Sequence, residues 1–131
     1  MVFGISCWWL ILAIAVYFGV GAIWYSPQVL AKQWLKELGK SRADIESPGA
    51  AMIATLAAIV VLVTIEAYFV NATGTSTWLR GAYLGAKLWL GFALTTALIN
   101  NAFQGASKKL LLIDQGYHFI GIVLAGAILA H

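Results

Sequence analysis

Long, uninterrupted runs of hydrophobic residues dominate the chain and predict helices that cross a membrane. A helix that spans a bilayer needs about 20 consecutive, mostly apolar residues. Polar or turn-forming residues bound each such run. The predicted spans are residues 5–25, 49–70, 78–100 and 110–130. A membrane β-barrel would instead show shorter segments in which apolar and polar positions alternate. The pattern therefore predicts an all-α, integral membrane four-helix bundle, with residues 1–131 forming a single membrane domain.

Between the first two spans the pattern changes to that of a short amphipathic helix over residues 27–39. Ser26 and Pro27 resemble an N-cap followed by proline at the first helical position, and Gly39 suits the helix end. Apolar side chains share one face and polar ones the other: Leu30, Ala31, Trp34, Leu35 and Leu38 against Lys32, Gln33, Lys36, Glu37 and Lys40. Such a helix lies in the membrane interface, and it also suits a cap over the end of the bundle.

The composition agrees with a membrane protein and excludes an ordinary soluble domain. Hydrophobic residues make up 62% of the chain and charged residues only 10%, whereas soluble domains average about 45–50% and about 25%. The single cysteine, Cys7, excludes a disulfide framework. A secretory signal peptide is the alternative for the first run, but a positively charged start is missing and the run is too long. We therefore expect a retained first span.

The distribution of lysine and arginine predicts the orientation. Basic residues cluster in the first and third connections: Lys32, Lys36, Lys40, Arg42, Lys108 and Lys109. The positive-inside rule places these connections in the cytoplasm, with both termini outside the inner (plasma) membrane. The net charge of +3 favours anionic lipids at the cytoplasmic face and gives no sign of nucleic acid binding. Aromatic residues at span ends are expected to be interfacial anchors: Trp8, Trp9, Trp24, Tyr25 and Trp34.

Charged residues inside the spans are the candidates for function, because each costs at least about 2.5–3.5 kcal/mol at a helix centre. At helical spacing, one side of the third span gathers polar or small residues: Arg80, Tyr83, Lys87, Gly91, Thr95 and Asn101. This side either lines a water-filled vestibule or packs closely against neighbouring helices. Depth along the spans favours an ion pair of Glu66 with Lys87 or Arg80, and an unpaired Glu66 that carries protons is the alternative.

The fourth span carries Asp114, Tyr117 and His118 on one face, with Asp114 and His118 at i and i+4. A carboxylate beside an imidazole can relay protons. Alternatively, the pair hydrogen-bonds at the helix end and anchors the cytoplasmic mouth together with Asn100 and Asn101. No set of three or four metal ligands is visible, so we expect no metal, no cofactor and no catalytic centre.

Small residues recur at four-residue spacing and predict closely approaching helices. They are Gly81 and Gly85, Ala50, Ala54 and Ala58, and Gly121 and Ala125. The spacing indicates assembly and carries no chemistry of its own.

These features favour a small channel or transporter that assembles as a homo-oligomer, since four helices enclose little space. Its path would follow the polar side of the third span. The alternative is an accessory subunit that packs against another membrane protein. A membrane-embedded enzyme is the third class, and no nucleophile or metal centre supports it.

Several motifs resemble a known bacterial family. They are the run from Gly21 to Pro27 with Trp34 downstream, the run from Trp89 to Thr96, Asn100 with Asn101, and the run from Leu112 to His118. Together they resemble the domain-of-unknown-function family numbered 1761, over nearly the whole chain. The resemblance implies a small membrane protein with four spans, and it implies no activity, substrate or cofactor.

Overall fold

The computed structural model describes residues 2–26, 31–39, 48–105 and 107–131, and its regular structure there is helical apart from one isolated bridge between Val2 and Ile5. The elements are α1 (Cys7–Trp24), α2 (Ala31–Leu38), α3 (Pro48–Ala72), α4 (Trp78–Leu88), the π-helical η2 (Trp89–Leu94), α5 (Thr95–Gln104) and α6 (Lys108–Leu129). Four helices are long and apolar enough to cross a membrane: α1, α3, the continuous rod of α4, η2 and α5, and α6. The predicted all-α fold with four such helices is confirmed.

The observed helices begin and end close to the predicted spans. The largest difference is at the third span, which was predicted to end at residue 100 and continues to Gln104. Gly105, with φ of 65°, ends it in the left-handed region, and Ser107 caps α6 by accepting hydrogen bonds from the Lys109 and Leu110 amides. The predicted amphipathic helix is present as α2; its first four expected positions, 27–30, lie outside the described residues.

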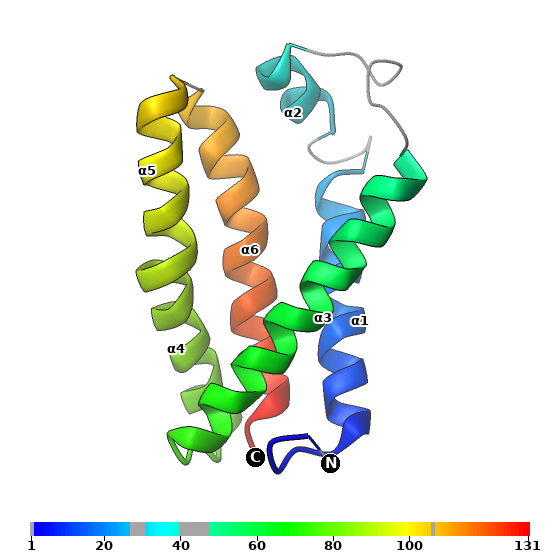
Figure 1. Ribbon diagram of the computed structural model, residues 1–131, viewed down its shortest axis with the longest axis vertical. Helices are drawn as coiled ribbons and strands as arrows, with labels where there is room; N and C mark the ends of the chain where they lie inside the picture. The colour runs from blue at the N-terminus through cyan, green and yellow to red at the C-terminus, as the bar shows by residue number, and fades with distance from the viewer. Residues whose placement is uncertain (1, 27–30, 40–47, 106) are drawn as a thin grey trace.

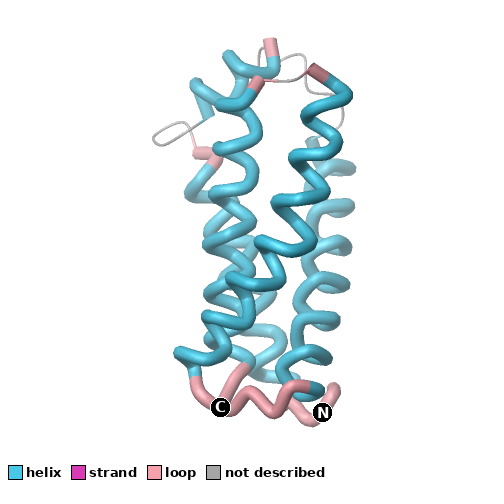
Figure 2. The backbone as a smooth tube through the Cα atoms, turned by 90° about the vertical axis from the view of Figure 1, so that its left-hand side faces the viewer, coloured by secondary structure: helices cyan, strands magenta, loops and turns pink. Residues whose placement is uncertain are grey.

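The helices are arranged around α6 (Figure 1). Helices α1 and α4 lie on either side of it and make its most extensive contacts, whereas α3 crosses the bundle obliquely and touches α4 little. Both chain ends lie at one end of the molecule, which we call the terminal end (Figure 2). Helix α2 lies at the opposite, loop end, where the Ser107 hydroxyl donates to the Glu37 carboxylate.

The tightest contact in the bundle joins α4 to α6 through glycines. Gly81 and Gly85 are buried on α4. A Cβ on Gly81 would collide with the Gly126 carbonyl oxygen, and one on Gly85 would lie 2.6 Å from the Ile122 carbonyl oxygen. Without side chains, the two backbones approach closely, as in other membrane helix pairs. The prediction from the Gly81 and Gly85 spacing is confirmed.

The other two predicted rows of small residues do not form backbone contacts of this kind. Gly121 on α6 lies under the ring of Tyr17 from α1, where a Cβ would approach to within 2.8 Å of the ring. Ala50, Ala54 and Ala58 on α3 are exposed. The alanine row therefore plays no part in packing within one copy of the protein.

We predict that Gly81→Ala lowers the free energy of unfolding by about 1–3 kcal/mol, because the added methyl group forces the two helix backbones apart. Gly19→Ala is the matched control, since Gly19 is also in a helix and nothing lies within 4 Å of its would-be Cβ. Equilibrium unfolding of both variants in mixed micelles, followed by circular dichroism, measures the difference. Equal stability of the two variants would contradict the close contact.

Candidate functional site

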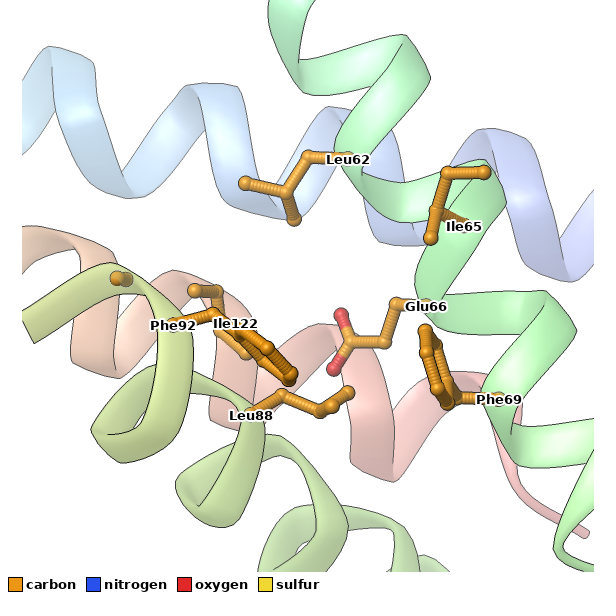
Figure 3. A pocket seen from close by; sticks show the side chains of 8 residues that line it. Leu62, Ile65, Glu66, Phe69, Leu88, Phe92 and Ile122 are labelled. Carbon is orange, nitrogen blue, oxygen red and sulfur yellow. The ribbon is translucent and has the colours of Figure 1, made fainter. Parts of the chain in front are cut away.

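Glu66 on α3 is the most unusual polar group of the bundle. Its side chain is 3% exposed, and neither carboxylate oxygen has a hydrogen-bond partner. It lies in a cavity of about 500 Å³. The cavity is otherwise lined by apolar residues from α3, α4, η2 and α6: Leu62, Ile65, Phe69, Leu88, Phe92, Ala93 and Ile122. Figure 3 shows the carboxylate pointing into the space among these side chains. We call this cavity the Glu66 cleft.

Glycine on α6 makes room for the carboxylate. A Cβ on Gly126 would lie 3.0 Å from Oε2 of Glu66. The same glycine forms the close contact with Gly81. The Glu66 carboxylate therefore lies beside the point where α4 and α6 touch.

The predicted ion pair of Glu66 with Lys87 or Arg80 is wrong. Glu66 has no hydrogen-bond partner, and Lys87 Nζ lies over the ring of Tyr83 at 4.6 Å from its centroid. The reason is the orientation of α4: Gly81 and Gly85 face α6, and side chains two positions further along lie about 200° around the helix. Tyr83 and Lys87 are therefore exposed on the outside of the protein.

These outward residues border a second hollow of about 690 Å³, which we call the cationic groove. It lies between α4 and α6, and its lining includes Arg80, Tyr83, Lys87, Phe119 and Val123. Phe119 and Val123 are in the middle of α6, which begins at residue 108 and ends at 129, so Lys87 lies near half its depth. The groove shares no lining residue with the Glu66 cleft.

The expected single polar face of the third span is also wrong in its second half. Thr95 and Asn100 are exposed, as Arg80 and Lys87 are, but Asn101 is buried. Asn101 accepts a hydrogen bond from Lys108 Nζ (3.0 Å) and donates to the Ser107 carbonyl oxygen (3.3 Å), which fixes the turn into α6. The prediction assumed uniform α-helical spacing, whereas the π-helical η2 has a wider turn and rotates all later positions.

Asp114 and His118 each form a hydrogen bond with a tyrosine of α1 or its C-cap. The Tyr25 hydroxyl donates to Asp114 Oδ1 (2.6 Å), and the Tyr17 hydroxyl shares a hydrogen bond with His118 Nδ1 (2.6 Å). The Tyr117 hydroxyl donates to the Tyr17 carbonyl oxygen (3.2 Å). Asp114 and His118 therefore hold α6 to the tyrosines of α1 and its C-cap. We call these five residues the tyrosine network. Asn101, which was expected to join them, hydrogen-bonds to Ser107 and Lys108.

Tyr17 was not among the predicted site residues, although its side chain is fully buried. It lies in the middle of an apolar span, and a buried tyrosine hydroxyl usually requires a hydrogen-bond partner. The presence of a tyrosine there therefore indicated a buried hydrogen bond. The sequence did not identify His118 as the partner of the Tyr17 hydroxyl, because the two residues are 101 positions apart.

The tyrosine network borders a third cavity of about 640 Å³ toward the loop end, lined also by Phe18, Trp34 and Met52.

The aromatic residues that were expected to be interfacial anchors fall into two groups. Trp8 and Trp9 are exposed, at 80% and 42%. Trp24, Tyr25 and Trp34 are half-buried and pack within the protein: the Trp24 ring donates to the Ile113 carbonyl oxygen, and the Trp34 ring contacts that of Tyr25. These three side chains therefore contribute to packing within the protein, and their expected position at the membrane interface stays a prediction.

We predict that Tyr17→Phe lowers the free energy of unfolding by about 1–3 kcal/mol, because it leaves the His118 nitrogen without its partner. Tyr68→Phe is the matched control, since Tyr68 is 47% exposed and packs through its ring. Unfolding of both variants in mixed micelles measures the difference. If Tyr17→Phe were as stable as Tyr68→Phe, the network would not hold α1 to α6.

Comparison with known proteins identifies the family and nothing finer. The model of a family described as protein of unknown function (DUF1761) matches residues 8–130. No curated protein and no solved structure matches the chain. The family match covers nearly the whole sequence, and it confirms the resemblance seen in the motifs. The chain therefore belongs to the DUF1761 family of proteins of unknown function.

Proposed function

We propose that the protein is a small channel or transporter that passes inorganic anions and is assembled from two or more copies. The observation that carries this proposal is the exposure of Lys87 near half the depth of α6. On this proposal the activity is the passage of ions and involves no catalysis.

The cationic groove would be unfavourable if it faced lipid. A basic side chain in the middle of a bilayer costs at least about 2.5–3.5 kcal/mol. The Tyr83 ring, 4.6 Å from Lys87 Nζ, offsets only part of this cost. Among the described residues no carboxylate forms an ion pair with Lys87 or Arg80. A second copy that covers the groove removes both cations from lipid.

A symmetric contact between copies brings the same surface of each copy together. Lys87 and Arg80 of both copies then face one another, and their repulsion falls only when water and anions occupy the seam. Rings of lysine or arginine line anion-selective pores for the same reason. Thr95 and Asn100, exposed nearer the loop end, add polar groups on the same rod of helix.

An accessory subunit is the second candidate, and the same groove supports it. A different membrane protein that supplies carboxylates would neutralise Lys87 and Arg80 without forming a path. Mass spectrometry of the protein released gently from its own membrane separates the two. We expect a homo-oligomer; a fixed-ratio complex with another membrane protein would replace the transporter proposal with the accessory one.

We predict that Lys87→Met abolishes chloride flux through proteoliposomes of purified protein, because the seam loses its deepest cation. Lys32→Met, on the exposed face of α2, is the control and should conduct as the native chain does. Flux is measured with a chloride-quenched dye inside the vesicles. Absence of flux in the native protein, or undiminished flux in Lys87→Met, would overturn the proposal.

We also propose that the chain lies in the plasma membrane with both termini outside and with α2 facing anionic lipids of the cytoplasmic leaflet. Lys32, Lys36, Lys108 and Lys109, which belong to α2 and the start of α6 at the loop end, support this orientation. Cys7, the sole cysteine, is exposed at the start of α1 and provides the test. A membrane-impermeant maleimide should label it in intact cells. Labelling only after the cells are opened would reverse the orientation.

A further inference from the structure

We propose that the Glu66 cleft binds a lipophilic amine, that is, a protonated primary or secondary amine carried on an apolar body. The site goes beyond the proposed anion path and does not depend on it. The two hollows share no lining residue, and they are bordered by adjacent positions of α4 and α6: Leu88 and Ile122 for the cleft, Lys87 and Val123 for the groove.

The first argument is that no protein group satisfies the carboxylate that points into the cleft. The Glu66 side chain is only 3% exposed, and neither of its carboxylate oxygens accepts a hydrogen bond. Buried carboxylates are normally paired or hydrogen-bonded, because isolation in apolar surroundings is costly. The volume of about 500 Å³ lies within the range of about 300–1,000 Å³ that is typical of small-molecule sites. A ligand that brings donors to Glu66 would satisfy both oxygens.

The second argument concerns the chemistry of the ligand. Glu66 is the single polar residue in the lining, so the ligand needs one polar group and an apolar remainder. An ammonium group supplies both a positive charge and N–H donors, which matches two unsatisfied carboxylate oxygens. Phe69 and Phe92 line the same cleft as the carboxylate (Figure 3), and the face of an aromatic ring attracts a cation.

A metal ion fits the cleft poorly. Calcium takes six to eight oxygen ligands and magnesium requires octahedral coordination. Within the described ranges, no three histidine, cysteine, aspartate or glutamate side chains come together as ligands. Glu66 would be the only protein oxygen donor from a side chain of the lining. An organic cation, by contrast, needs only one counter-charge.

The third argument concerns access. Ile65 and Phe92 of the lining are 48% and 68% exposed, so the cleft reaches the outer surface between α3 and the rod of α4 and η2. This surface is apolar and belongs to spanning helices, so it faces the hydrocarbon of the bilayer. A ligand that enters there must partition into lipid, which again requires an apolar body on the amine.

The test is equilibrium dialysis of 2-(1-naphthyl)ethylamine against the purified full chain in phosphatidylcholine nanodiscs, with empty nanodiscs subtracted. We expect saturable binding that weakens by about tenfold or more in Glu66→Gln, since the buried counter-charge is lost. Glu37→Gln, the same change on α2, is the control and should bind as the native chain does. The trimethylammonium analogue, which has no N–H donor, and the corresponding alcohol should both bind more weakly than the amine.

Equal affinity of the native chain and Glu66→Gln, or equal affinity for amine and alcohol, would overturn the proposal. Ala93→Leu is a second variant, which narrows the cleft and keeps the carboxylate. It should also weaken binding, and it decides the question if Glu66→Gln does not fold by circular dichroism. Amine binding in a chain that conducts no chloride would overturn the anion path alone, so the two proposals fail separately.

Discussion

The contact between α4 and α6, in which Gly81 and Gly126 bring two backbones together, determines most of what the rest of the molecule can do. Inside a bilayer the hydrophobic effect does not drive helices together, so close packing and hydrogen bonds between helices take its place. That contact selects the face of α4 that is buried. It thereby turns Lys87 outward, and it leaves Glu66 beside the contact without a cation to pair with.

Helix α6 holds its other neighbours by different means. At α1 the tyrosine network adds hydrogen bonds to ring packing, with Tyr17 against His118 and Tyr25 against Asp114. At α3 no comparable set of bonds exists among the described residues, and the helix crosses obliquely (Figure 1). The tightly packed side of the bundle gives stability, whereas the loosely packed side contains the Glu66 cleft.

Much of the fold could be predicted from the sequence, because the number and bounds of the long helices depend on the lengths of the hydrophobic runs. The hydrophobic runs set the four long helices, and the spacing of Gly81 and Gly85 indicated that a helix would approach closely. The rotation of each helix depends on tertiary contacts. The ion pair of Glu66 with Lys87 was inferred from depth alone, and depth does not say which way a side chain faces. The hydrogen bond of the Trp24 ring could not be predicted for a similar reason, because tryptophans at span ends suit both lipid contact and internal hydrogen bonds.

The central claim is that Glu66 and Lys87 lie on different sides of the α4–α6 contact and do not interact. A double-mutant cycle of Glu66→Gln and Lys87→Met measures their coupling free energy directly, from unfolding of the native chain, both single variants and the double variant in mixed micelles. Separated sites predict additive effects, with coupling within about 0.5 kcal/mol of zero. Coupling of about 1–3 kcal/mol would show a buried ion pair and would contradict the account.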